Sequence, residues 1–441
     1  MDIKNNVLFK KKELLNFCVL RFIFGISYSF MIPIIPLYFD SIGIATIAIG
    51  TIMSLYGVGK ALAQVIFGLI TEKLGDKVTL VAILGLMTVV PFLYTIVHTK
   101  MLASTIYVIQ GTVLGMAAPA TYSILARSLD YEKRGECTGY ASAVFTLGGG
   151  IGAAIGGFIV ARLTNYNLVF YMACAGIAMS CLFALFKIKK PCIEEWQEGK
   201  DDQECEKSTK VKKEDYKDEY KYKYEEKKDK NKYEEKKEKC PKNLNGIWEE
   251  LKNDKLWSKV ILLASIAFLG DYIYGCVVSI FPFYGQEVLG TSAAYTSAII
   301  SIYLFVFGIF APLGGWTCDK IGNNRQLFLS FIVMSATLLG ISLSRSKVIF
   351  AIIIVIYFLG ATFLNSSLQS LLSEFGENNK IKGIVFGLVG ASESIGYAVS
   401  PILSAYVYEW NKLLLFVQLL AFSLGVFGIF LLLRKKANII N

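Results

Sequence analysis

Histidine is almost missing from this chain of 441 residues, which contains only His98. One histidine supplies neither a His-ligated metal site nor a convincing Ser/His/Asp triad. The nine cysteines occur without a C-x-x-C pair or another metal-binding spacing, and no G-x-x-x-x-G-K-[ST] nucleotide-binding loop is present. We therefore expect no enzyme activity, no metal, no cofactor and an energy source other than ATP.

Charged residues are also scarce outside one central segment. Hydrophobic residues make up 54% of the chain and the mean hydropathy is +0.51, whereas soluble proteins contain about 45–50% apolar residues. A membrane helix needs about 20 apolar residues, and the sequence has twelve such runs: 14–38, 46–70, 79–98, 101–125, 138–161, 166–188, 260–283, 293–315, 326–344, 347–372, 382–406 and 411–433. The first run lacks an A-x-A-like cleavage site, so we expect it to be retained. The sequence predicts an all-α membrane protein with twelve transmembrane helices.

Lysine and arginine are unevenly distributed between the two sides of the predicted membrane. With the N-terminus inside, 17 basic residues lie in the cytoplasm and five lie outside, not counting the central segment. Cytoplasmic loops retain such residues. We expect a multi-pass protein of the plasma (cytoplasmic) membrane whose N- and C-termini are both cytoplasmic.

The segment 189–259 differs from its surroundings, because it contains 21 basic and 20 acidic side chains. Such a segment cannot bury a core, so we expect a disordered cytoplasmic linker. It separates an N-terminal half, 1–188, from a C-terminal half, 260–441. No basic patch with exposed stacking aromatics accompanies the formal charge of +10, so nucleic acid is not an expected partner.

Several landmarks recur at a nearly constant distance along the chain. The charged stretch 68–77 returns as 315–324, an offset of 247 residues. The tripeptide Pro36-Leu37-Tyr38 has its counterpart at 282–284, an offset of 246. A constant offset indicates a duplicated unit. We therefore predict two pseudo-symmetric bundles of six helices each.

Several polar residues lie inside the apolar runs, where an ionisable group is costly and marks a functional site by default. The deep charged residues are Lys60, Asp271 and Glu393, and Arg21 lies closer to the cytoplasmic end. Their neighbours that we also assign to substrate binding or coupling are Tyr28, Tyr56, Gln64, Tyr274 and Tyr397. A structural ion pair for Lys60 and a snorkelling side chain for Arg21 are the alternatives.

The repeated turn carries a glycine, an acid and a base at fixed places. They are Gly68, Glu72, Lys73 and Gly75 in the first copy, and Gly315, Asp319, Lys320 and Gly322 in the second. With two six-helix halves, these turns resemble the motif G-x-x-x-D-[RK]-x-G-[RK]-[RK] of the major facilitator superfamily, although Glu72 replaces the aspartate and Asp76 replaces a base. The resemblance covers essentially all of the chain except 189–259. It implies two halves that rock about a site near the midplane.

The fifth apolar run is marked by five glycines: Gly139, Gly148, Gly152, Gly156 and Gly157. The spacing of four places 148, 152 and 156 on one face, where another helix can pack closely. The run resembles the motif G-x8-G-x3-G-P-x2-G-G of drug:proton antiporters, with Ala153 in place of the proline. In the fourth run, Tyr107 stands where similar exporters carry an arginine implicated in proton coupling. The resemblance thus implies antiport in which Lys60 or Arg21 supplies the charge, or a different coupling.

The expected function is secondary active transport of small molecules, as proton-coupled efflux of amphipathic or drug-like compounds. The expected partners are the small-molecule substrate, the proton and the lipid bilayer, and we expect a monomer. Two alternatives stay open: import of a sugar, organic anion or other nutrient, and a non-transporting membrane sensor. Asp271, Glu393 and the tyrosines suit an organic cation, whereas Lys60 and Arg21 suit an anion.

Asp271 is the expected proton carrier, because a carboxyl group subject to both burial and a nearby lysine can titrate near neutral pH. Glu393 is the alternative carrier, or else the partner of Lys60. The turns are expected to act as a conformational latch. Glu72 is placed to bond backbone amides near Lys382, where a helix N-terminus attracts anions.

Overall fold

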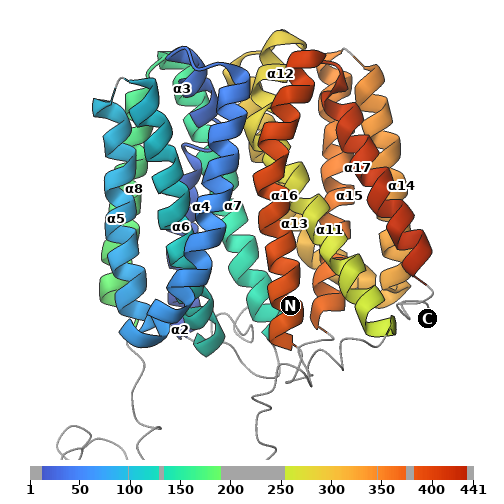
Figure 1. Ribbon diagram of the computed structural model, residues 1–441. Helices are drawn as coiled ribbons and strands as arrows, with labels where there is room; N and C mark the ends of the chain where they lie inside the picture. The colour runs from blue at the N-terminus through green and yellow to red at the C-terminus, as the bar shows by residue number, and fades with distance from the viewer. Residues whose placement is uncertain are drawn as a thin grey trace, which may run out of the picture. The chain divides into compact units, whose positions relative to one another are not determined.

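A computed structural model of the chain describes residues 12–97, 99–128, 134–189, 254–344, 346–373 and 382–434. All regular structure within these ranges is helical (Figure 1). The predicted linker 189–259 lies outside them except at its two ends. The two halves that flank it belong to one compact unit.

The N-terminal half contains seven described helices. They are α2 (Lys12–Ser29), α3 (Ile35–Ser41), α4 (Thr46–Leu74), α5 (Asp76–Ile96), α6 (Lys100–Ser128), α7 (Arg134–Leu163) and α8 (Tyr166–Lys187). The expected single helix over 14–38 is interrupted, because α2 ends before Phe30 and α3 starts with Pro36 in its first turn. Proline fits a first helical turn, where its missing N–H group is not needed. The pair α2 and α3 therefore makes one bent crossing.

The C-terminal half repeats this pattern. Its described helices are α11 (Asp254–Ser279), α12 (Phe281–Glu287), α13 (Ala293–Ile321), α14 (Asn323–Leu343), α15 (Lys347–Ser373), α16 (Lys382–Trp410) and α17 (Leu414–Leu433). Pro282 lies in the first turn of α12 as Pro36 does in α3. Among the described residues, ten helices are long and apolar enough to span a membrane. The other two crossings are α2–α3, which carries Arg21, and α16, which carries Glu393.

The duplication predicted from the 247-residue offset is confirmed in the helices and in the turns between them. Both α4 and α13 have 29 residues, and their starts differ by 247. Each is joined to the next helix by one glycine, Gly75 (φ 83°, ψ 143°) or Gly322 (φ 85°, ψ 148°). The charged stretch is thus mostly helical, and the turn itself is a single residue.

A second pair of equivalent contacts lies at the opposite end of the bundles. Lys100 Nζ donates to the carbonyl oxygen of Gly43 at 2.6 Å, and Lys347 Nζ donates to that of Gly290 at 2.9 Å. Both glycines have positive φ, at 78° and 59°. Equivalent lysines therefore donate hydrogen bonds to equivalent turns in the two halves.

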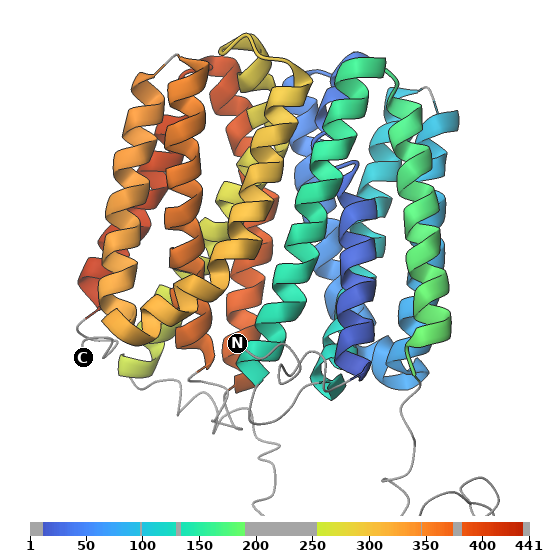
Figure 2. The same cartoon turned by 180° about the vertical axis from the view of Figure 1, so that it is seen from behind.

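The two halves stand side by side in Figure 1, with α2 to α8 in blue to green and α11 to α17 in yellow to red. The edge where α2 begins and α17 ends is called the terminal end here, and α3 and α12 lie at the far end. Figure 2 shows α7 beside α13 from behind. These two helices, and α4 with α16, form the main contacts between the halves. Apolar side chains such as Phe186 and Leu343 are exposed on the outer surface, as in helices that face lipid.

Candidate functional site

A cavity of about 290 Å³ lies between the two halves. The N-terminal half lines it from α2, α3, α4, α6 and α7, and the C-terminal half lines it from α11, α13 and α16. Six residues assigned from the sequence are brought together here: Tyr28, Tyr56, Lys60, Asp271, Tyr274 and Tyr397. A pocket of this size, mostly apolar with a few polar groups, is typical of a site for a small organic molecule.

Aromatic rings form much of the cavity wall. They belong to Tyr28, Tyr56, Tyr107, Phe145, Tyr274, Tyr303, Phe307 and Tyr397. The rings of Tyr56 and Tyr107 stack with their centroids 4.7 Å apart, and the ring of Tyr397 lies 5.9 Å from that of Tyr56. Because Tyr397 belongs to the C-terminal half, this row of rings crosses the boundary between the halves. Flat aromatic or apolar molecules can pack against such surfaces.

Lys60 and Asp271 are the charged residues in this lining. Lys60 Nζ lies 5.8 Å from the ring centroid of Tyr397. Within the described ranges, no carboxylate oxygen lies within 4.0 Å of Lys60 Nζ, so the expected alternative of a structural ion pair does not hold there. Lys60 still acts electrostatically on both Asp271 and Glu393. The cavity lining therefore offers one positive and one negative group that are not within ion-pairing distance of each other.

Four buried side chains of the N-terminal half form a hydrogen-bonded chain. The hydroxyl of Tyr94 donates to Gln110 Oε1 at 3.0 Å, and Gln110 Nε2 donates to the hydroxyl of Tyr28 at 3.4 Å. The hydroxyls of Tyr28 and Tyr56 are 2.5 Å apart. Tyr94 and Gln110 were not among the predicted site residues. The available signal was a glutamine in the apolar run of α6.

The contacts between the halves lie at the level of the cavity and toward the far end. Ser301 Oγ donates to the carbonyl oxygen of Gly150 at 2.6 Å, and the N–H group of Ile402 donates to Ser54 Oγ at 3.1 Å. A methyl group on Gly57 would lie 2.8 Å from the ring of Tyr397, so only glycine allows this approach of α4 and α16. These contacts close the cavity toward the far end.

The arrangement of two duplicated six-crossing halves around one central cavity agrees with the sequence comparison. The sequence profile of the Major Facilitator Superfamily matches residues 17–384. The chain belongs to this superfamily. The resemblance inferred from the repeated turns is thereby confirmed.

Relatives within the superfamily are distant. The Quinolone resistance protein NorA of Staphylococcus aureus is 24% identical over 170 residues, which cover 38% of this chain and 43% of the relative. An uncharacterized MFS-type transporter of Methanocaldococcus jannaschii is 26% identical over 146 residues, 33% of this chain and 38% of the relative. The chain thus matches less than half the length of these relatives.

Solved structures of transporters share the fold over nearly the whole chain. The nucleoside transporter NupG has a TM-score of 0.67 at 13% identity and covers 96% of this chain and 99% of its own. A bacterial homolog of the human lysosomal transporter Spinster, solved inward-facing and unoccupied, has a TM-score of 0.71 at 12% identity, with 96% of each chain covered. These likenesses establish the two-bundle fold.

Three other predicted site residues lie outside the lining of the cavity. The guanidinium carbon of Arg21 is 4.1 Å from the ring centroid of Phe145, a cation–π contact on the terminal side of the cavity. Gln64 and Glu393 are partly exposed and lie one helical turn from the lining residues Lys60 and Tyr397. Both turns lead toward the terminal end, so the cavity ends before it reaches them.

The first copy of the superfamily turn is described only in part. The side chains of Glu72 and Lys73 and the surroundings of Gly68 lie outside the described part, as does the side chain of Lys382. Asp76 is buried directly after Gly75, where Ser123 Oγ donates to its Oδ2 at 3.1 Å. Its other oxygen accepts the N–H group of Lys77 at 2.7 Å. An acid in the first turn of α5 is favourable because a helix N-terminus attracts negative charge.

The second copy of the turn, 315–324, is described in full. Asp319 and Lys320 are both exposed, and Lys320 Nζ lies 3.9 Å from the ring centroid of Trp316. A methyl group on Gly315 would meet nothing within 4 Å. The described parts of the two copies share the backbone geometry of Gly75 and Gly322.

The glycine-rich face of α7 packs against the first helix of its own half. A methyl group on Gly148, Gly152 or Gly156 would collide with the carbonyl oxygen of Phe22, Ile26 or Phe30, respectively. Gly157 instead faces Ser297 of α13, across the boundary between the halves. The side-chain surroundings of position 139 lie outside the described part of α7. Thus α7 is held closely by α2 on one face and by α13 on another.

Proposed function

We propose that the chain is a proton-coupled exporter of small amphipathic molecules that carry an aromatic part and a cationic group. The observation that carries the proposal is Asp271, a carboxyl group without an ion-pair partner among the described residues, in a cavity walled by tyrosines from both halves. An acid at such a depth in a membrane protein is costly unless it binds a cation or a proton. Aromatic walls supply the matching apolar contact.

Export is the proposed direction, and the charges of the loops and the closed far end support a loading state that opens to the cytoplasm. The proposal takes the terminal end to face the cytoplasm, at the plasma membrane, and the excess of basic residues at that end supports this orientation. The halves are in contact from the cavity to the far end, so this arrangement loads from the cytoplasmic side. Alternation with an arrangement open at the far end would then release the substrate outside.

Coupling in this proposal is competition at one carboxyl group. An ionised Asp271 attracts the cationic group of the substrate, and a protonated Asp271 does not. A proton entering from outside therefore releases the substrate and resets the site. Lys60 lines the same cavity, so its positive charge favours the ionised form of Asp271 while no substrate is bound. Glu393 remains the alternative carrier.

The remaining parts of the chain have supporting roles in this scheme. The repeated turns, including Glu72, Asp319 and Lys320, act as a latch between alternating states at the cytoplasmic end. The segment 189–259 is a tether between the halves, whose charges balance to a net of +1. The transporter acts as a monomer, since both walls of the cavity come from one chain.

The test is ethidium flux into liposomes that contain the purified full-length protein under an imposed pH gradient. The native protein is expected to move ethidium against its concentration gradient until a protonophore is added. Asp271→Asn should abolish uphill flux and leave downhill exchange detectable. Glu409→Gln, which removes an exposed acid away from the cavity, is the control for loss of one charge. Normal uphill flux by Asp271→Asn would remove this residue from the mechanism, and the same loss in Glu393→Gln alone would move the role to α16.

Lys60 favours a second candidate function, transport of an organic anion. Its ammonium group faces the cavity and, within the described part of the chain, has no acid within ion-pairing distance. Flux of an aromatic carboxylate that is lost in Lys60→Met but retained in Asp271→Asn would support this candidate. Absence of flux for either class of probe, in protein that is folded and inserted, would favour a sensor.

A further inference from the structure

The hydrogen-bonded chain at Tyr28 and Tyr56 has a direction. Tyr94 donates to the carbonyl oxygen of the Gln110 side chain, so the NH₂ group of Gln110 faces Tyr28. An amide nitrogen has no lone pair to offer. The hydroxyl oxygen of Tyr28 therefore accepts this hydrogen bond, and its own proton must go elsewhere.

The hydroxyls of Tyr28 and Tyr56 carry two protons but share one hydrogen bond. One proton of the pair is left over, and no other acceptor for it occurs among the described residues. A chain in which each group accepts from one neighbour and donates to the next is strengthened by mutual polarisation. Tyr28 accordingly donates to Tyr56, and the proton of Tyr56 is available to a molecule in the cavity.

The position of this donor relates it to the two charges. Tyr56 and Lys60 are one helical turn apart on α4, so they share a face of that helix, and both line the cavity. Asp271 lines the same cavity from the other half. A hydrogen-bond donor and a cation thus lie together on one element, and the acid lies on another, with stacked tyrosines around them.

We propose that Tyr56 and Lys60 form a subsite for an oxygen acceptor, so that the cavity selects aromatic amines that also carry a carbonyl or carboxylate group. The inference rests on the proposed role of the cavity as the substrate site. In this subsite Tyr56 donates a hydrogen bond to the acceptor oxygen, and Lys60 adds attraction when that oxygen is charged. Gln110 and Tyr94 are positioning residues, because they act only by directing the hydroxyls.

Three matched probes separate these contributions: 2-(aminomethyl)naphthalene, its 6-acetyl derivative and its 6-carboxylate. The first has the aromatic amine alone, the second adds a neutral acceptor, and the third adds a charged one. Binding is measured by calorimetry on the purified full-length protein in detergent at neutral pH. One net hydrogen bond predicts that the acetyl probe binds about threefold to tenfold more tightly than the plain amine. The carboxylate is expected to bind more tightly still.

The variants are chosen so that the plain amine reports whether the cavity is intact. Tyr28→Phe/Tyr56→Phe removes both protons of the pair and is expected to abolish the acetyl preference while plain-amine affinity is retained. Gln110→Leu removes the amide that donates to Tyr28, so either hydroxyl of the Tyr28–Tyr56 pair can then donate to the other. It should reduce the preference for the acetyl probe without abolishing it. Lys60→Met should remove only the advantage of the carboxylate over the acetyl probe. Tyr171→Phe removes an exposed tyrosine hydroxyl outside the cavity and should leave the acetyl preference unchanged.

Equal affinities of the native protein for the plain and acetyl probes, including no measurable binding of either, would overturn the subsite. Full retention of the acetyl preference in the double phenylalanine variant would also overturn it. Because binding is measured without a gradient, the two proposals fail separately. Binding with the expected preference but without proton-driven flux would refute the exporter and retain the subsite. Proton-driven flux without the preference would do the reverse.

Discussion

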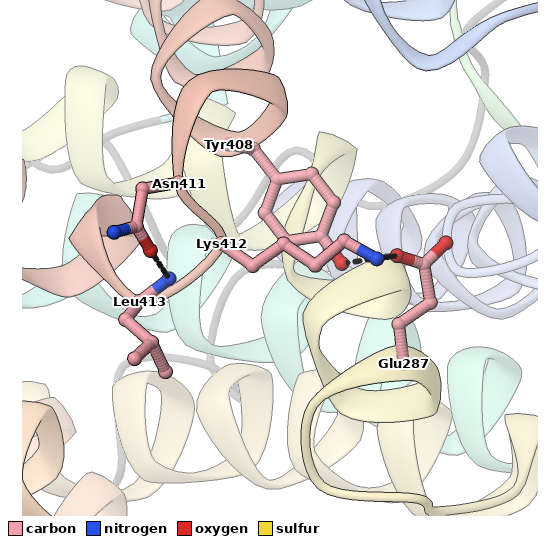
Figure 3. Close-up of polar contacts among 5 residues, drawn as sticks. All are labelled: Glu287, Tyr408, Asn411, Lys412 and Leu413. Atoms are coloured by element: carbon pink, nitrogen blue, oxygen red, sulfur yellow. Dashed lines mark hydrogen bonds and ion pairs between the residues drawn. The ribbon is translucent and has the colours of Figure 1, made fainter.

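Lys412 Nζ lies 2.6 Å from a carboxylate oxygen of Glu287, and this ion pair joins the connection between α16 and α17 to the end of α12 (Figure 3). The hydroxyl of Tyr408 donates to the same oxygen at 2.8 Å. The helix α12 contacts α3 of the other half, and the charge of Glu287 acts electrostatically on Asp40 of α3. Lys412 therefore neutralises one of two acids that meet where the far end closes.

Loss of Lys412 is expected to loosen the closure of the far end. Both partners are about half exposed, so the pair contributes about 0.2–1 kcal/mol. In Lys412→Met the uncompensated Glu287 repels Asp40, which favours separation of the halves. Spin labels at Met101 and Val348, two exposed equivalents 247 residues apart, report this as a population of longer distances in a cysteine-free background.

The double variant Glu287→Gln/Lys412→Met serves as the control for Lys412→Met. It removes both charges, so the distances should return to those of the native protein. Longer distances in both variants would show that Lys412 acts through packing and not through Glu287.

Closure of the far end is also expected to depend on pH through Asp40. Asp40 lies beyond the apolar run 14–38, where partial desolvation, and secondly the charge of Glu287, raise its pKa above the usual value. Asp40 also acts electrostatically on Tyr166. The closed arrangement therefore gains stability that is fully present below the usual aspartate pKa of about 3.9. It loses this stability as the pH rises through the raised pKa.

The same pair of spin labels measures this dependence. In the native protein, acidic pH should increase the population of short distances between the labels at Met101 and Val348. Rising pH should increase the population of longer distances. Asp40→Asn cannot ionise, so its short distances should persist across the range. An unchanged pH dependence in that variant would assign the effect to another group.

Much of the fold could be predicted from the sequence, because membrane thickness sets helix length. The duplication also gives each helix an equivalent in the other half against which its position can be checked. The offset of 247 residues correctly paired α4 with α13 and their terminal glycines. The bend after α2 followed the prolines. The charged stretch 68–77 was predicted as a tight turn, but helix α4 continues through most of it to Leu74, since glycine at 75 completes the reversal alone.

For the candidate site, the sequence indicated which faces of the helices are shared but not how far along those helices the cavity extends. Lys60 and Tyr397 line the cavity, whereas Gln64 and Glu393 lie on the same helices one turn further toward the terminal end. Periodicity along one helix indicates which side is shared, but the extent of a cavity depends on packing between helices. Gln110 was overlooked for the same reason, because its partner Tyr28 is 82 residues away in the sequence.

Substitution of a glycine in α7 is expected to destabilise the protein where the backbone of another segment lies directly against that glycine. In Gly152→Ala the new methyl group would overlap the carbonyl oxygen of Ile26, which belongs to helix backbone and cannot rotate away. Overpacking of this kind costs about 1–3 kcal/mol of the free energy of unfolding. Gly425→Ala in α17 is the matched control, since nothing lies within 4 Å of its new methyl group. Thermal unfolding in detergent should separate the two, and equal melting temperatures would contradict close packing of α2 on α7.

The last prediction concerns the two single-residue turns, where space and backbone conformation make opposite demands. A methyl group on Gly75 or Gly322 would meet nothing within 4 Å, so crowding predicts no cost for alanine. Their φ and ψ of about 83° and 143° lie in a region that is essentially restricted to glycine, however, and strain there costs about 1–3 kcal/mol. Gly75→Ala and Gly322→Ala should each lower the free energy of unfolding by that amount. Because the sites are in different halves, the double variant should show the sum. Asparagine should not rescue either position, since it tolerates the left-handed helical region but not this ψ. Gly315→Ala, a helical position that is equally open, controls for the added methyl group. If Gly75→Ala, Gly322→Ala and Gly315→Ala all unfold at the melting temperature of the native protein, these turns relax without strain. They then cannot fix the angle between the helices that they join.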